Sequence, residues 1–194
     1  THSALSVSRL KTRINDSAGL LTKKYAELVQ PKLLVVPQQA FLGTLIDGFG
    51  DAIGRHRAEG KLLSSQGEKI TSKPYDGKNV WAWDEYKDAD VNGNLVYRPQ
   101  EFSANHGGVL KQDLPEGFEI ILTEDMPNLP LKGEGKKVGT RCQFETGRTA
   151  EEYLKGLRFD KRYDGEEGMT PEAGIVGQLT RLEEKNMVTD DKTV

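Results

Sequence analysis

The chain has 194 residues, of which 36% are hydrophobic and 29% charged, and its formal net charge is −3. A single cysteine and three histidines exclude an internal disulfide and a zinc site of four cysteines or of two cysteines and two histidines. The 27 basic residues do not outnumber the 30 acidic ones, so we do not expect a broad nucleic-acid-binding surface. Residues 1–60 are locally basic, with eight Lys and Arg against five Asp and Glu, and leave nucleic acid open as a partner there.

Targeting and membrane segments are not indicated. The first 20 residues contain no apolar run of the length that a signal peptide needs, so we expect a non-secreted protein, in the cytoplasm or within a viral particle. A membrane span requires about 20 mostly apolar residues. Polar residues and a proline interrupt the most apolar stretch, residues 33–53, so we expect no membrane partner.

Residues 4–29 are expected to form an amphipathic helix, because apolar side chains recur at the a and d positions of a seven-residue pattern. These side chains are Val7, Leu10, Ile14, Leu21 and Leu28. Ser17 and Lys24 interrupt the stripe, and Pro31 ends the helix. The stripe predicts either packing on the chain's own domain or an arm whose five apolar residues form an interface with a neighbouring subunit.

Residues 32–36 can form a short buried strand or an extended link. A second helix is expected from about residue 38, because Leu42, Ile46, Phe49 and Ile53 follow helical spacing. Residues 60–78 are polar and end in turn-forming residues. We therefore divide the chain into a helical arm or hairpin at 1–60, a linker at 61–78, an α+β domain at 79–186 and a polar tail at 187–194.

The middle of the chain favours strands. Residues 80–83 and 94–97 are expected to pair as a hairpin, because Asn92 and Gly93 between them are typical of a type I′ turn. Alternating side chains predict further strands at 118–123 and 138–145, joined by a long loop at 124–137. This predicts a small, mostly antiparallel sheet.

Two helices are expected near the C-terminal end. Thr149 and Glu152 form a capping-box pattern, and Thr170 followed by Pro171 is a second helix start. Together with the N-terminal helical arm or hairpin and the small sheet in the middle, they define an α+β fold.

The clearest candidate for chemistry is a calcium-loop pattern at residues 88–95. Asp88, Asp90 and Asn92 occupy side-chain ligand positions, and Asn94 would supply a backbone carbonyl. Pro99 stands where the pattern requires a bidentate Glu. The alternative is a plain hairpin turn with solvated acids. Calcium is the metal that this turn suggests, and no organic cofactor is expected.

Other candidates for chemistry are weaker. Cys142 falls on an apolar strand face, where a buried thiol is usually inert. His106 lies in a glycine-rich turn, but the chain has no Gly-x-Ser-x-Gly nucleophile motif. Trp81 and Trp83 would share one strand face, as part of a core or as a stacking surface.

Three function classes follow. The first is a non-enzymatic structural or assembly subunit of a multisubunit particle, for instance a virion component, with self-association or other protein partners. The second is a calcium- or ligand-binding module at residues 88–94. The third is a metal-dependent hydrolase or nuclease that uses Asp113, Glu116 and Glu119. No catalytic residue stands out, so an enzyme is the less favoured class.

Overall fold

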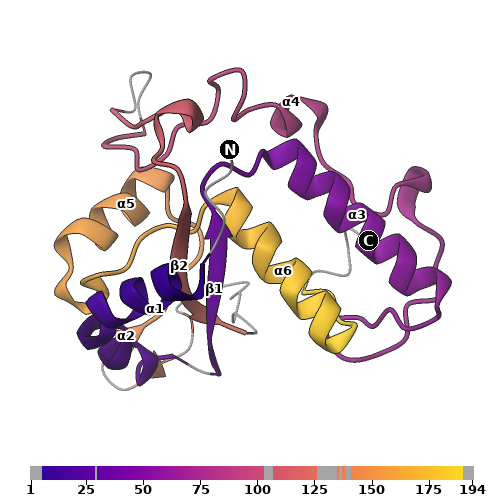
Figure 1. Cartoon of the computed structure of the whole chain (residues 1–194), viewed down its shortest axis with the longest axis horizontal. Coiled ribbons are helices and arrows are strands. Elements are labelled where there is room, and N and C mark those ends of the chain that lie inside the picture. The colour runs from indigo at the N-terminus through magenta and orange to yellow at the C-terminus, as the bar shows by residue number, and fades with distance from the viewer. Residues whose placement is uncertain are drawn as a thin grey trace.

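The computed structural model describes residues 6–28, 30–102, 107–125, 135, 137–138 and 141–189. Within these ranges the fold is α+β, as predicted, with six α-helices and two antiparallel strand pairs, one long and one short (Figure 1). The helices are α1 (Val7–Asp16), α2 (Ala18–Tyr25), α3 (Leu42–Ala58), α4 (Asp84–Lys87), α5 (Ala150–Phe159) and α6 (Pro171–Lys185). The strands are β1 (Pro31–Pro37), β2 (Phe118–Glu124), β3 (Lys137–Val138) and β4 (Arg141–Cys142).

The long strands β1 and β2 pair with each other over their whole length, with Leu34 opposite Ile121. A strand was expected at 118–123, and residues 32–36 had been left as a strand or an extended link. The alternation of β1 buries Leu34 and Val36 on one face. The pairing of β2 with β1 was not predicted. β3 and β4 form a separate ladder, in which each strand has two residues. Strand alternation specifies a buried face but no partner, because long-range pairing depends on the rest of the fold.

Helix α6 lies between the strand pair and α3, and packs on both (Figure 1). It approaches β1 closely at Gly177, where an added Cβ would stand 3.2 Å from the Leu34 side chain. The main core cluster joins α3, α6 and the segments that flank them. Its buried members are Phe49, Ala52, Ile53, Leu62, Leu182 and Val188.

Residues from the predicted linker (61–78) and the predicted tail (187–194) contribute to this core. Leu63 bridges to Met187, and the backbone N–H of Val188 donates to the carbonyl of Leu63 at 3.0 Å. Val188 is 1% exposed. Leu62 and Val188 therefore pack in the same core cluster as α3 and α6.

The expected hairpin at 80–97 is wrong. Residues 84–87 form α4, residues 88–93 form turns, and Tyr97 bridges to Val109 instead. Gly93 has a positive φ of 81°, as a turn there requires. The local turn preference is weaker than the burial of Asp90 and Tyr97, which are 1% and 5% exposed.

The N-terminal helix is also interrupted, since Ser17 separates α1 from α2. Arg13 of α1 donates to the carbonyl of Phe118 at 2.9 Å and lies over its ring. The two helices lie beside the strand pair (Figure 1). α1 is amphipathic but contains no buried residue.

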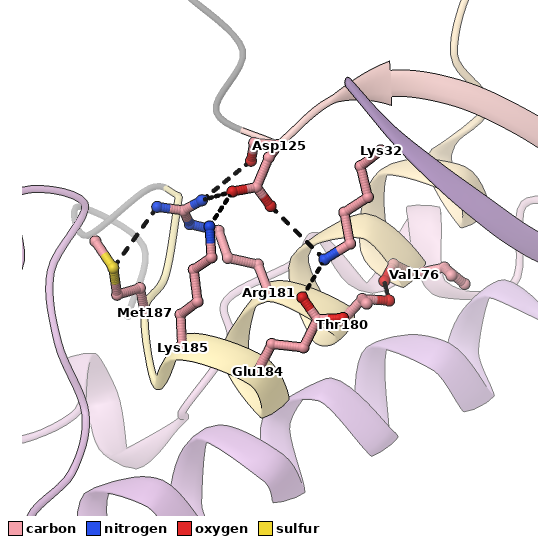
Figure 2. A network of polar contacts seen from close by, with 8 residues as sticks. All are labelled: Lys32, Asp125, Val176, Thr180, Arg181, Glu184, Lys185 and Met187. Carbon is pink, nitrogen blue, oxygen red and sulfur yellow. Dashed lines mark hydrogen bonds and ion pairs between the residues drawn. The ribbon is translucent and has the colours of Figure 1, made fainter. Parts of the chain in front are cut away.

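An ionic cluster ties the C-terminal half of α6 to the ends of β1 and β2 (Figure 2). Arg181 donates to the Asp125 carboxylate at 2.9 Å and to its backbone carbonyl at 3.1 Å. Lys185 also bonds to Asp125, and Lys32 lies 3.6 Å from it while pairing with Glu184. We call these five residues the Asp125 cluster.

Burial raises the pKa of Asp125, but the hydrogen bond and charge of Lys185, together with Arg181 and Lys32, outweigh burial and hold the pKa below its ordinary value. The carboxylate is therefore kept ionised by its neighbours. A buried charge that is paired in this way stabilises the contact between helix and strands.

Candidate functional site

A pocket of about 580 Å³ opens between β1, residues 95–102, α5 and the N-terminal end of α6. We call it the α5–α6 pocket. Most of its wall is apolar. The main apolar side chains are Val36, Leu95, Leu114, Leu154, Leu157 and Met169. Known small-molecule sites have volumes of roughly 300–1,000 Å³ and mainly hydrophobic linings, so its size and wall suit an organic ligand.

Three buried polar side chains line the same pocket and contact one another. Lys111 donates to Glu172 Oε1 at 3.0 Å, and the Tyr97 hydroxyl donates to the same oxygen. Asp90 lies behind them, with its Oδ2 4.0 Å from Lys111 Nζ. We call these four residues the Glu172 cluster. Its charged side chains are at most 3% exposed, so its electrostatics are little screened by solvent.

Two helix N-termini position the two carboxylates. Thr170 caps α6 by accepting from the Ala173 N–H, and Pro171 begins the helix, so Glu172 falls in its first turn. Asp90 Oδ2 accepts from the N–H of Leu42, the first residue of α3, at 2.7 Å. Helix N-termini favour negative charge because their N–H groups are unpaired within the helix.

The cluster holds more negative than positive charge. Burial raises the pKa of Tyr97 far above its ordinary value, and the Glu172 carboxylate raises it further, so the phenol stays neutral. Lys111 alone then faces two carboxylates. Among the described residues, Glu172 Oε2 and Asp90 Oδ1 have no hydrogen-bond partner although both are buried. Buried acceptors without partners are unusual in native proteins and call for an explanation.

The predicted calcium-loop residues are not all on the surface. Asp88, Asn92 and Asn94 are exposed, whereas Asp90 is buried and bonded to α3. The Asn92 side chain accepts from the Asn94 N–H at 3.1 Å, a contact within the turn. The described ranges contain no group of three or more His, Cys, Asp or Glu suited to a metal ion. Calcium binding at this turn stays a prediction.

The predicted interface residues lie on α1, α2 and the segment after them. Val7 is 68% exposed, while Leu10, Ile14, Leu21 and Leu28 are partly buried. Lys24, which interrupts the stripe, is buried and bonds to Glu166 at 2.9 Å. The stripe is thus partly packed on the chain itself, and its role as an interface stays a prediction.

The remaining candidates are dispersed. Cys142 is buried, and its carbonyl accepts from the Tyr163 hydroxyl. Trp81 and Trp83 are exposed and pack edge to face, with 4.6 Å between their ring centroids. They do not lie in a strand, contrary to the prediction. Glu119 bonds to Gln38 and Arg98. His106 and most of the loop at 124–137 lie outside the described residues.

Sequence reasoning missed Lys111, Tyr97 and Glu172 as site residues. Lys111 and Glu172 are 61 positions apart, and each stands in an ordinary local context, a polar turn and a helix start. No local spacing could have joined them. Of the four residues in the cluster, only Asp90 had been predicted as a site residue, and it had been predicted as a calcium ligand.

Comparisons with known proteins add no identity: no family model matches the chain, and neither the curated proteins nor the solved structures contain a significant match. Among the helices that the structure describes, each falls short of the length and apolar character that crossing a bilayer requires.

Proposed function

We propose that this protein is a ligand-binding module that holds a small, largely apolar molecule in the α5–α6 pocket. The observation that carries the proposal is the pocket itself, about 580 Å³ in volume and mostly apolar in its wall, with the buried side chains of Lys111, Tyr97 and Glu172 in its lining. A few convergent polar groups in an apolar cavity are typical of sites that orient an organic ligand.

The apolar wall would supply most of the affinity. Leu154 and Leu157 of α5 face the pocket together with Leu114 and Val36 from the other side. Each methylene that leaves water contributes about 0.8 kcal/mol. The polar cluster would add orientation, because its geometry is set by helix caps and core packing before any ligand enters.

Binding of N-phenylnaphthylamine, a neutral apolar dye that fluoresces in apolar surroundings, tests the proposal. We expect saturable binding to the native protein and loss of binding in Leu157→Arg, which places a charged side chain in the pocket. Phe159→Arg is the matched control, because Phe159 lies on the same helix but is 80% exposed and does not line the pocket. An absence of dye binding, or equal binding by both variants, would contradict the proposal.

A second candidate function is assembly. α1 is amphipathic yet buries none of its residues, and Val7 is 68% exposed, which favours docking on another subunit. The protein would then be a non-enzymatic structural subunit of a multisubunit particle, in the cytoplasm or within a virion. Light scattering tests this: we expect an oligomer that Val7→Asp dissociates and Ser8→Asp, an exposed polar control on the same helix, does not.

A further inference from the structure

The buried carboxylate of Glu172 has one oxygen to which no described residue donates a hydrogen bond. Glu172 Oε1 accepts from both Lys111 and Tyr97, while Oε2 has no hydrogen-bond partner among the described residues. The side chain is 3% exposed and lines the α5–α6 pocket. A buried carboxylate oxygen without a hydrogen-bond partner costs free energy. A ligand that donates a hydrogen bond to this oxygen would recover that free energy on binding.

The charge of the cluster indicates the kind of donor. Asp90 and Glu172 bring two negative charges, Lys111 brings one positive charge, and Tyr97 is a neutral phenol. One positive charge placed at Glu172 Oε2 would make the cluster electrically neutral. A carboxylate or phosphate would instead add a third negative charge to a site that water screens poorly.

Apart from Glu167, the other charged residues of the pocket wall are already paired with protein groups. Glu119 pairs with Arg98, Glu166 pairs with Lys24, and Arg158 donates to the carbonyls of Pro99 and Gln100. Glu167 also lines the pocket but is exposed at its rim. Glu172 is therefore the carboxylate that combines burial, an unpaired oxygen and contact with the pocket.

We infer that the α5–α6 pocket binds an amphiphilic amine, whose protonated amino group donates to Glu172 Oε2 while its apolar body lies against Leu154, Leu157 and Met169. This inference rests on the proposed ligand-binding function and specifies its ligand class. The amino group is held by hydrogen bonds and charge alone, and no covalent step is involved. The size of the pocket suits a chain or ring system comparable to an ordinary drug molecule.

The test is displacement of bound N-phenylnaphthylamine by three eight-carbon ligands, octylamine, octanol and octanoate, at neutral pH. The three share one apolar chain and differ only in head group. A hydrogen bond to a charged group is worth enough to change affinity by about tenfold to a hundredfold. We expect octylamine to bind tighter than octanol by about that factor, and octanoate to bind weakest.

Two matched variants locate the effect. Glu172→Gln keeps the shape of the side chain and removes its charge, and we expect it to abolish the preference for octylamine over octanol. Glu167→Gln makes the same change at the rim and should keep the preference. If Glu172→Gln does not fold, the head-group series on the native protein decides alone.

The outcomes separate the inference from the function on which it rests. If octanol and octanoate displace the dye as well as octylamine does, the amine assignment is overturned and the ligand-binding module stands. If Glu167→Gln abolishes the preference and Glu172→Gln does not, the assignment is likewise overturned. If the dye never binds, the proposed function fails first.

Discussion

The two ends of α6 each carry an ionic cluster, and the two clusters have opposite charge balances. At the C-terminal half, Lys32, Arg181 and Lys185 surround Asp125, with Glu184 beside them (Figure 2). At the N-terminal end, Lys111 alone faces Asp90 and Glu172. Both arrangements agree with the helix dipole, which favours cations at the C-terminus and anions at the N-terminus.

The difference lies in how completely each carboxylate is paired. Both oxygens of Asp125 contact cations, Oδ1 with Lys32 and Oδ2 with Arg181 and Lys185. Glu172 Oε2 and Asp90 Oδ1 have no partner among the described residues. A carboxylate whose two oxygens are both paired stabilises a fold, whereas a carboxylate with an unpaired oxygen beside a pocket can bind a ligand. A buried carboxylate is therefore a candidate for ligand binding where one of its oxygens is unpaired and the side chain lines a pocket, as Glu172 does.

The largest expected effect comes from removing the one cation of the Glu172 cluster. Lys111→Met leaves the buried Asp90 and Glu172 without the cation that they share, and we expect a loss of about 4 kcal/mol in the free energy of unfolding. Urea denaturation measures it. Lys155→Met is the control, since Lys155 is an exposed ion-pair partner of Glu151 and should cost less than about 1 kcal/mol. Equal losses of unfolding free energy in the two variants would mean that Lys111 does not stabilise the buried carboxylates of the cluster.

The Asp125 cluster should respond somewhat less. Asp125→Asn removes the negative charge that Arg181 and Lys32 face, and we expect a loss of about 3 kcal/mol, again by urea denaturation. The neighbouring Lys185→Met should cost less than about 1 kcal/mol, because Lys185 is 45% exposed and two cations remain. A loss from Lys185→Met as large as that from Asp125→Asn would show that no single charge organises the cluster.

Acid should remove the contribution of Asp125 selectively. Its folded-state pKa lies below the ordinary value of 3.8, so its stabilisation is fully present above that pH and is lost as the pH falls through the lower folded-state pKa. We expect the stability difference between the native protein and Asp125→Asn to stay constant from neutral pH to about pH 5 and to shrink below 3.8. A difference that grows on acidification would contradict the assigned direction.

The smallest expected effect concerns the pocket wall alone. Thr149 and Glu152 form the observed capping box of α5, and Thr149→Ala should cost about 1 kcal/mol. Hydrogen exchange should accelerate in α5 and leave the backbone around Arg181 unchanged. Faster exchange both in α5 and around Arg181 would show that the pocket wall and the Asp125 cluster unfold as one cooperative unit.

Local patterns predicted much of the secondary structure. The alternation at 118–123, the Thr149 capping box and the Thr170–Pro171 start each correspond to an observed element. These signals act within a few residues, through side-chain periodicity and backbone capping, so sequence alone contains them. The failed hairpin at 80–97 had an equally good local signal, in Asn92 and Gly93, but tertiary burial of Asp90 and Tyr97 overrode it.

Neighbouring residues were thus enough to predict the α+β class, the starts of α5 and α6 and the strand at 118–123. Only the tertiary structure decided that β1 pairs with β2, that α6 packs on α3, and that Lys111 meets Glu172. These contacts join residues far apart in the chain, and their free energy comes from shared burial. The pocket and its unpaired carboxylate exist for the same reason, as products of long-range packing that no local spacing encodes.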